Sequence, residues 1–112
     1  MAQQRMRRVD EAIRQVLADA LSGELADPRV GFVTVTDVRT SPDLRSARVF
    51  VSVLGDEGAR EGSLAGLRSA HGVLQRRIAV ELHLKRTPAL EFAYDSTTDR
   101  ALRVDELLRE HP

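Results

Sequence analysis

The sequence predicts an α+β fold in which a three-stranded sheet is covered by helices. Two observations carry this prediction. Apolar residues recur at helical spacing in some segments, and β-branched or alternating runs mark three strands between them. The order is helix, strand, strand, helix, helix, strand and a C-terminal helix. Because a chain of 112 residues without a repeat or linker holds one core, we expect a single domain over 1–112, with flexible ends at 1–4 and 110–112.

The first half of the chain predicts a helix followed by a hairpin. Residues 4 to 25 form the helix because one apolar stripe recurs at i, i+4, i+7 and i+8, and Pro28 ends it. The stripe consists of Val9, Ile13, Val16, Leu17, Ala20 and Leu21. Residues 31 to 39 are rich in β-branched types, and residues 47 to 53 have one alternating apolar face. Because the turn at 41–43 is short, an antiparallel hairpin is the simplest arrangement.

The second half predicts two helices, a strand and a last helix. Residues 55 to 62 are rich in glycine and acid, so we expect a flexible connection there, with Ser63 as the N-cap of a helix over 63–70. A helix over 73–84 and a strand over 88–94 follow. The C-terminal helix is predicted from a capping segment and an apolar set, which are 95–99 and Leu102, Leu107 and Leu108.

Positive charge is gathered in two places, although the formal net charge of the chain is zero. The two basic clusters are Arg5, Arg7 and Arg8, and Arg68, Arg76, Arg77, Lys85 and Arg86. Acidic residues collect elsewhere, at 56–61 and beyond residue 94. A bipolar surface of this kind can orient a small protein on a polyanion. The alternative is that these charges only solvate the surface.

A small-residue break, Ala70-His71-Gly72, separates the two predicted middle helices. Glycine costs a helix interior about 1 kcal/mol relative to alanine, so its presence favours a kink. The helix after a kink offers an anion site at its N-terminus, within reach of the arginines. The alternatives are a turn that needs small residues for packing, and a neutral surface role for His71. The candidate RNA-binding residues are Arg5, Arg7, Arg8, Arg68, Ser69, Ala70, His71, Gly72, Arg76, Arg77, Lys85 and Arg86.

Other kinds of site find little support. The segment 55–58 matches the Gly-x-x-Gly loop of KH domains, but it follows a strand and its two acids would repel phosphate, so we expect a surface turn. The chain has no cysteine, and its three histidines lack the spacing of metal ligands. No nucleophile motif is present, so we expect neither an enzyme nor a cofactor. No apolar run approaches the roughly 20 residues that span a membrane, so a cytoplasmic protein is expected.

An ordered set of short motifs over nearly the whole chain resembles the bacterial ribosome-binding factor A family. The motifs are Arg7-Arg8-Val9, 33–38, 41–44, 47–53, Ser69-Ala70-His71-Gly72, 86–92, Tyr94-Asp95 and 104–108. No single motif is diagnostic, whereas their order is specific. Two features depart from the family: this chain is less basic, and its C-terminal tail is short.

The resemblance implies a type II KH-like domain in which an Ala-x-Gly kink, at 70–72, replaces the Gly-x-x-Gly loop. It also implies a non-enzymatic assembly factor that binds the immature small (30S) ribosomal subunit and its ribosomal RNA and promotes late maturation and rRNA processing. Family members are linked to growth in the cold and to release by a ribosome-associated GTPase, and nothing in the sequence demands more than a monomer. The alternative is a KH-like protein-docking module without RNA contact.

Overall fold

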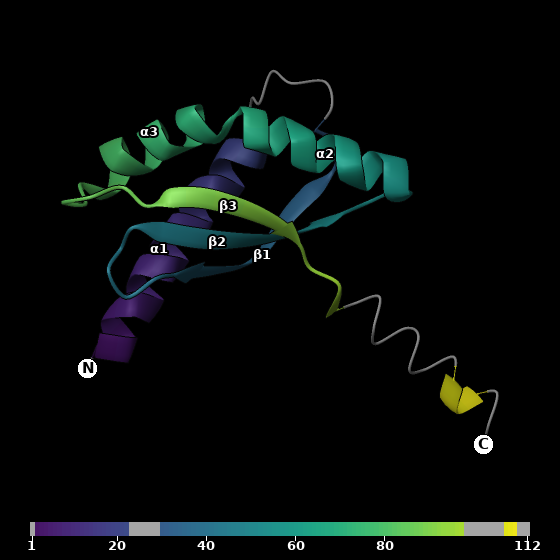
Figure 1. Ribbon diagram of the computed structural model, residues 1–112, viewed down its shortest axis with the longest axis horizontal. Coiled ribbons are helices and arrows are strands. Elements are labelled where there is room, and N and C mark those ends of the chain that lie inside the picture. The colour runs from purple at the N-terminus through teal and green to yellow at the C-terminus, as the bar shows by residue number, and fades with distance from the viewer. Residues whose placement is uncertain (1, 23–29, 98–106, 110–112) are drawn as a thin grey trace.

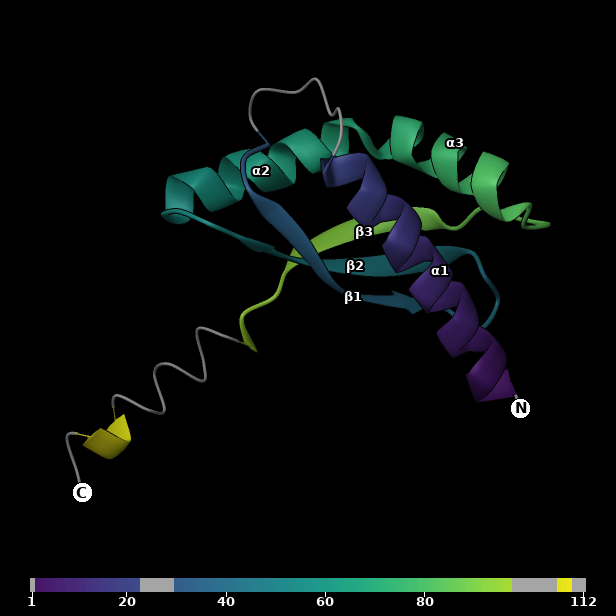
Figure 2. The same cartoon turned by 180° about the vertical axis from the view of Figure 1, so that it is seen from behind.

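The structure is a computed structural model that describes residues 2–22, 30–97 and 107–109 (Figure 1). The order of its elements is the predicted one, and the helices lie over one face of a three-stranded sheet in a type II KH-like arrangement (Figures 1 and 2). The elements are α1 Ala2–Ser22, β1 Val33–Thr40, β2 Ser46–Val53, α2 Glu57–Ser69, α3 His71–Leu82 and β3 Ala89–Tyr94. None of the helices in these ranges is long and apolar enough to cross a membrane.

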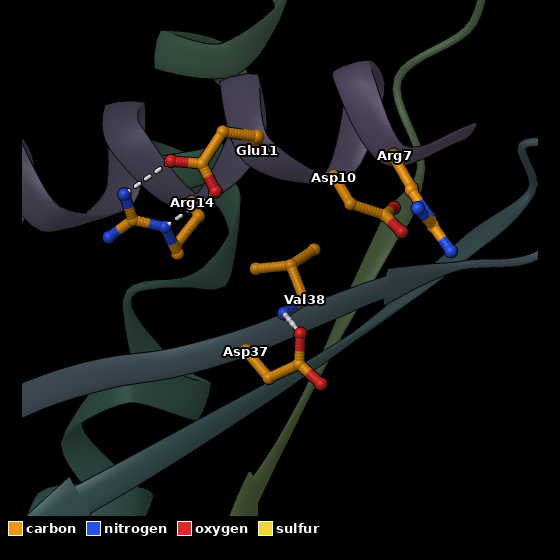
Figure 3. A pocket seen from close by; sticks show the side chains of 6 residues that line it. All are labelled: Arg7, Asp10, Glu11, Arg14, Asp37 and Val38. Carbon is orange, nitrogen blue, oxygen red and sulfur yellow. Dashed lines mark hydrogen bonds and ion pairs between the residues drawn. The ribbon is translucent and has the colours of Figure 1, made fainter. Parts of the chain in front are cut away.

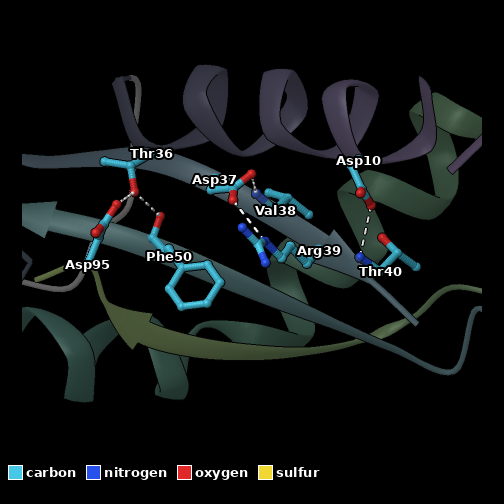
Figure 4. Close-up of polar contacts among 8 residues, drawn as sticks. All are labelled: Asp10, Thr36, Asp37, Val38, Arg39, Thr40, Phe50 and Asp95. Carbon is cyan, nitrogen blue, oxygen red and sulfur yellow. Dashed lines mark hydrogen bonds and ion pairs between the residues drawn. The ribbon is translucent and has the colours of Figure 1, made fainter. Parts of the chain in front are cut away.

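The sheet is mixed, with the strand order β1-β2-β3. β1 and β2 form the predicted antiparallel hairpin, whereas β3 lies parallel to β2. A parallel pair needs a crossover connection, which here consists of α2 and α3 (Figure 1). The register of β1 and β2 shifts between Val35 and Asp37, and the Thr36 hydroxyl between them donates to the Asp95 carboxylate at 2.6 Å (Figure 4).

The core fills the space between the helices and the sheet. β2 and β3 turn alternate side chains inward, as their period of two requires, whereas the buried Val35 and Val38 of β1 are three residues apart across the register shift. α1 contributes the apolar stripe predicted from its helical spacing. The buried apolar residues are Ile13, Val16, Leu17, Ala20, Val35, Val38, Ala47, Val49, Val51, Val53, Leu67, Leu74, Ile78, Leu90 and Phe92. The opposite face of the sheet has no described helix against it (Figures 1 and 2).

The hairpin turn is held by the polar side chains that predicted it. The Ser41 hydroxyl donates to the Asp43 carboxylate at 2.6 Å, and the backbone N–H of Ser46 donates to the Ser41 hydroxyl at 3.1 Å. Asp43 also accepts from the backbone N–H of Arg45 at 3.1 Å. The Ser41 hydroxyl, followed by this N–H, lowers the pKa of the Asp43 carboxyl.

The expected flexible connection at 55–62 is wrong, because α2 already begins at Glu57. The Asp56 carboxylate accepts the Ala59 N–H at 2.8 Å and is therefore the N-cap. Gly55 before it has a φ of +130°, which its lack of a side chain allows. Ser63, predicted as the cap, is instead buried inside α2, where its hydroxyl accepts the Gly31 N–H at 3.2 Å.

Element ends differ from the predictions in smaller ways. α1 begins two residues before the predicted start, while 23–25 and Pro28 lie outside the described residues. α3 begins at His71 rather than 73, and His83 ends it with a left-handed φ of 50°. Of the predicted C-terminal helix, residues 107–109 are described and helical, and both leucines there are exposed. In the predicted capping segment 95–99, the Asp95 carboxylate accepts the Thr97 N–H at 2.9 Å, whereas residues 98 and 99 and Leu102 lie outside the described residues.

Side chains bond some of the outward backbone groups at both edges of the sheet. On β1, the outward N–H groups of Val38 and Thr40 donate to the carboxylates of Asp37 and Asp10, each at 2.9 Å (Figure 4). On β3, the carbonyl of Phe92 accepts a hydrogen bond from a side chain of α2. Unpaired backbone groups at an edge invite strand addition. A peptide that added a strand at either edge would therefore have to displace these side-chain bonds.

Candidate nucleic-acid interface

The predicted kink lies between α2 and α3. α2 ends at Ser69, and the N–H of Ala70 donates to the carbonyls of Gly66 at 3.0 Å and Leu67 at 3.1 Å. Ala70 itself has a φ of −88° and a ψ of 3°, outside helical geometry. The N–H of Leu74 then donates to the Ala70 carbonyl at 3.1 Å, so α3 begins without an intervening loop (Figure 1). The two helices therefore present one rigid bend rather than a flexible linker.

Gly72 has no packing partner that explains its lack of a side chain. A Cβ built at this position meets no heavy atom within 4 Å, leaving aside its chain neighbours and the local helix backbone. Ala70, by contrast, is half-buried and packs against the core. The packing explanation thus fits Ala70 but not Gly72. The glycine leaves open space on the outside of the kink, where a ligand backbone can approach closely.

The side chain of His71 is exposed but makes a hydrogen bond to the backbone of α2. Its Nδ1 lies 2.8 Å from the Arg68 carbonyl, so this nitrogen carries the proton and donates. The bond satisfies one of the last carbonyls of α2. In the neutral ring, Nε2 is then an acceptor. His71 therefore braces the kink, and its exposed ring remains a candidate contact.

The outer face of α3 combines basic and apolar side chains. We define this face as Gly72, Val73, Arg76, Arg77 and Val80, which helical spacing places opposite the buried Leu74 and Ile78. Both valines are about two-thirds exposed, at 65% and 64%. The two arginines are exposed as well, and Arg77 makes an ion pair with Glu81 at 3.3 Å. Such an exposed pair is weak and can exchange for a phosphate.

The two valines were missed as site residues. Their signal was present in the sequence, because Val73 and Val80 are spaced i, i+7 on the side of the helix that does not carry Leu74 and Ile78. Exposed large apolar side chains in a cluster mark contact surfaces. The sequence interpretation weighed Gly72 and the arginines of this face but not its valines.

Arg68 points away from the outer face of α3. Its guanidinium donates to the carbonyl of Phe92 on β3 at 3.2 Å and so occupies an outward backbone group at that edge of the sheet. This contact fastens the end of α2 to β3, next to the kink. Ser69 is exposed between Arg68 and the kink, and Lys85 and Arg86 are exposed in the segment that joins α3 to β3. The second basic cluster therefore divides into three parts. Arg68 bonds α2 to β3, Arg76 and Arg77 lie on the outer face of α3, and Lys85 and Arg86 lie in the segment between α3 and β3.

The N-terminal arginines form a separate surface. Arg5, Arg7 and Arg8 are exposed on the first turns of α1, which packs against β1 and projects past it at its N-terminal end, whereas α2 lies on the same face of the sheet over the opposite edge strand, β3 (Figures 1 and 2). The two predicted basic clusters are thus not brought together.

A hollow of about 330 Å³ lies beside Arg7, between α1 and β1 (Figure 3). Its charged lining holds three acids and two arginines, which are Asp10, Glu11, Asp37, Arg7 and Arg14. Arg14 donates to Glu11 and thereby lowers the pKa of that carboxyl. Because the acids outnumber the arginines, this hollow is a poor anion site compared with the outer face of α3.

Comparison with known proteins finds one family over nearly the whole chain. A family model described as ribosome-binding factor A matches residues 5–108. The crystal structure of ribosome-binding factor A from Thermus thermophilus is 30% identical, with a TM-score of 0.70 over 80% of this chain and 94% of that one. A solution structure from Thermotoga maritima, described as a putative ribosome-binding factor A, is 35% identical, with a TM-score of 0.72 over 80% and 85%.

A third match is a Thermus thermophilus ribosome-binding factor A homology model fitted into a cryo-EM map of a complex with the 30S subunit. It is 32% identical, with a TM-score of 0.63 over 75% of this chain and 88% of that one. The family model spans nearly the whole chain, and all three matched structures have an identity of 30% or more. This protein belongs to the ribosome-binding factor A family.

Proposed function

We propose that this protein is a non-enzymatic assembly factor that binds the immature small ribosomal subunit through its ribosomal RNA, and that it promotes late maturation and rRNA processing. The proposed RNA contact rests on one observation. Gly72, which the chain's own packing does not require, lies beside two exposed arginines on the outer face of α3. The fitted 30S complex of a relative supports the choice of the small subunit.

In this proposal the outer face of α3 recognises RNA mainly by its backbone. Arg76 and Arg77 pair with phosphates, while Gly72, which has no side chain, lets the RNA backbone come close to the kink. Val73 and Val80 give apolar contact to sugars or unstacked bases, which are available in unpaired RNA segments. Binding stabilises one conformation of the maturing RNA over others, which is a population shift without chemistry.

The remaining predicted residues take lesser roles in the proposal. Lys85 and Arg86 extend the contact beyond α3, and the α1 cluster of Arg5, Arg7 and Arg8 makes a second, outlying one. Arg68, Ser69, Ala70 and His71 shape the kink. We also propose that the protein acts as a cytoplasmic monomer with one domain, with release by a ribosome-associated GTPase and a greater need for it in the cold, as the family resemblance implies.

The exposed valines favour a second candidate function, a KH-like docking module that binds protein alone. Salt dependence separates the two. We expect co-sedimentation with purified small subunits to weaken steeply with salt, by about 0.7 to 0.9 log units per phosphate contact for each tenfold rise. Immature subunits should bind better than mature ones. Binding that is insensitive to salt, or equal for both subunit forms, contradicts the proposal.

Gly72→Ala tests the close approach of RNA to the kink. The added methyl group meets open space in the protein, so we expect folding to be unchanged or stabilised by up to about 1 kcal/mol. A strand docked against Gly72 would clash with it, which should weaken subunit binding by about 10-fold or more. Thermal unfolding and co-sedimentation measure the two effects.

Gly58→Ala is the matched control, because Gly58 is the second residue of α2 as Gly72 is of α3. A Cβ at Gly58 makes only an ordinary contact, at 3.4 Å from the Asp56 carboxylate. We expect this variant to bind subunits like the unmodified protein. Unchanged binding of a folded Gly72→Ala variant would remove the kink from the interface.

A further inference from the structure

Two large apolar side chains lie uncovered at one end of the sheet, far from the outer face of α3. Phe32 is 81% exposed and Leu54 is 76% exposed. Phe32 precedes β1 and Leu54 follows β2, and the Leu54 N–H donates to the Phe32 carbonyl at 3.0 Å. Residues opposed on neighbouring strands project to the same side of a sheet. Phe32 and Leu54 therefore form one surface, which we name the Phe32–Leu54 patch.

The patch lies just beyond the ends of the two strands. The next opposed pair, Val33 and Val53, packs with the core on the helix-covered face. Phe32 and Leu54 lie one residue outside β1 and β2 and are not buried with that pair, and Phe32 also lines a hollow at the end of α1. Neighbouring exposed apolar residues are typical of surfaces that bind another molecule.

The chain next to the patch is acidic. Asp56 follows Leu54 by two residues, and Glu57 and Glu61 lie on the first turns of α2, all three exposed. Asp56 caps the helix, whereas neither glutamate makes an ion pair with a described side chain. Over the 13 residues of α2, at about 1.5 Å each, the kink lies about 20 Å from Glu57. The acidic end is therefore distinct from the basic outer face of α3.

We propose that the Phe32–Leu54 patch docks a basic protein segment that carries an apolar side chain, of the kind found in a lysine- or arginine-rich extension of a ribosomal protein. An inserted apolar side chain would cover Phe32 and Leu54, while its basic neighbours would pair with Glu57 and Glu61. This inference rests on the proposed function, because it places the partner in the same small subunit.

Charge decides against two other occupants. An RNA strand would bring phosphates against the three acids, which is repulsive. A second copy of this chain would form a two-fold contact of the patch with itself and would set the same acids against each other. The patch thus gives the protein a protein-binding end and an RNA-binding end, separated along α2.

The test replaces both apolar residues, Phe32→Ser with Leu54→Ser, and measures co-sedimentation with purified small subunits. Because both side chains are exposed, we expect the melting temperature to stay within a few degrees and the affinity to fall by about 10-fold. Leu107→Ser with Leu108→Ser is the control, since it removes two exposed leucines outside the patch. A second variant, Glu57→Lys with Glu61→Lys, changes only charge and should weaken binding as well.

Cross-linking identifies the occupant. A benzophenone side chain at position 54, irradiated on purified small subunits, should give a product that protease removes and ribonuclease does not. A ribonuclease-sensitive product, a covalent dimer of this chain or the absence of any product would each overturn the inference. Unchanged subunit binding of the double serine variant would also overturn the inference. A large loss of its stability would overturn it as well, because this would mean that the chain itself covers the patch. Failure of the unmodified protein to bind subunits would instead overturn the proposed function, and the inference with it.

Discussion

Replacing Arg76 and Arg77 together by glutamate is expected to weaken small-subunit binding by about 100-fold or more while the protein stays folded. Both side chains are exposed on α3, so their reversal disturbs no core contact. The Arg77–Glu81 pair that is lost is surface-exposed and contributes little to stability. Each arginine that pairs with a phosphate also accounts for about one unit of the salt slope. Co-sedimentation over a salt series should therefore show a slope smaller by about two.

The matched control is Arg39→Glu with Arg48→Glu, which changes the net charge by the same amount as the α3 variant. It places the change on the face of the sheet that no described helix covers. These two arginines lie opposite each other in register on β1 and β2, and their ion pairs with Asp37 and Glu91 are exposed. We expect much weaker effects on binding from this pair. An equal loss in both variants would mean that total charge, rather than the outer face of α3, governs the affinity.

Leu67→Ala is expected to lower the free energy of unfolding by about 2 to 5 kcal/mol. Leu67 is fully buried on α2, one turn before the kink, and belongs to the core between the helices and the sheet. Truncation loses the transfer energy of the side chain and leaves a cavity. Because a domain of this size is stable by only about 5 to 15 kcal/mol, the variant loses a large part of its stability. Urea denaturation measures the change.

Leu64→Ala makes the same chemical change one turn earlier on α2, where the side chain is only half-buried. We expect a smaller loss for this variant, because less apolar surface returns to water. Equal losses at positions 64 and 67 would contradict burial against the sheet as the cause, because Leu64 is less buried than Leu67.

The strands and the kink could be predicted from the sequence because each has a local signal. Alternation fixes the faces of β2, the polar residues at 41–43 fix the turn, and Gly72 marks the bend. The start of α2 had no such clear signal. Glycine and acid from 55 to 62 lower helix propensity, and the burial of Ser63 against Gly31, which favours the helix, involves residues 32 positions apart.

The site was predictable as a set of residue types but not as an arrangement. The exposure of Arg76 and Arg77 follows from helical spacing around Leu74 and Ile78. The bond from Arg68 to Phe92 does not, because it joins residues 24 positions apart across a parallel strand crossover. The separation of the α1 arginines from the kink depends on how α1 crosses the sheet (Figure 2), which no local pattern encodes.

The side-chain hydrogen bonds at the two edges of the sheet affect how this protein behaves at high concentration. Fibrous aggregates grow when an exposed edge templates the backbone of the next chain. Here the carboxylates of Asp10 and Asp37 occupy outward N–H groups of β1, and Arg68 occupies a carbonyl of β3. A chain that polymerised by its edges would have to break these bonds first. Three charged side chains thus oppose β-linked self-assembly of the folded protein.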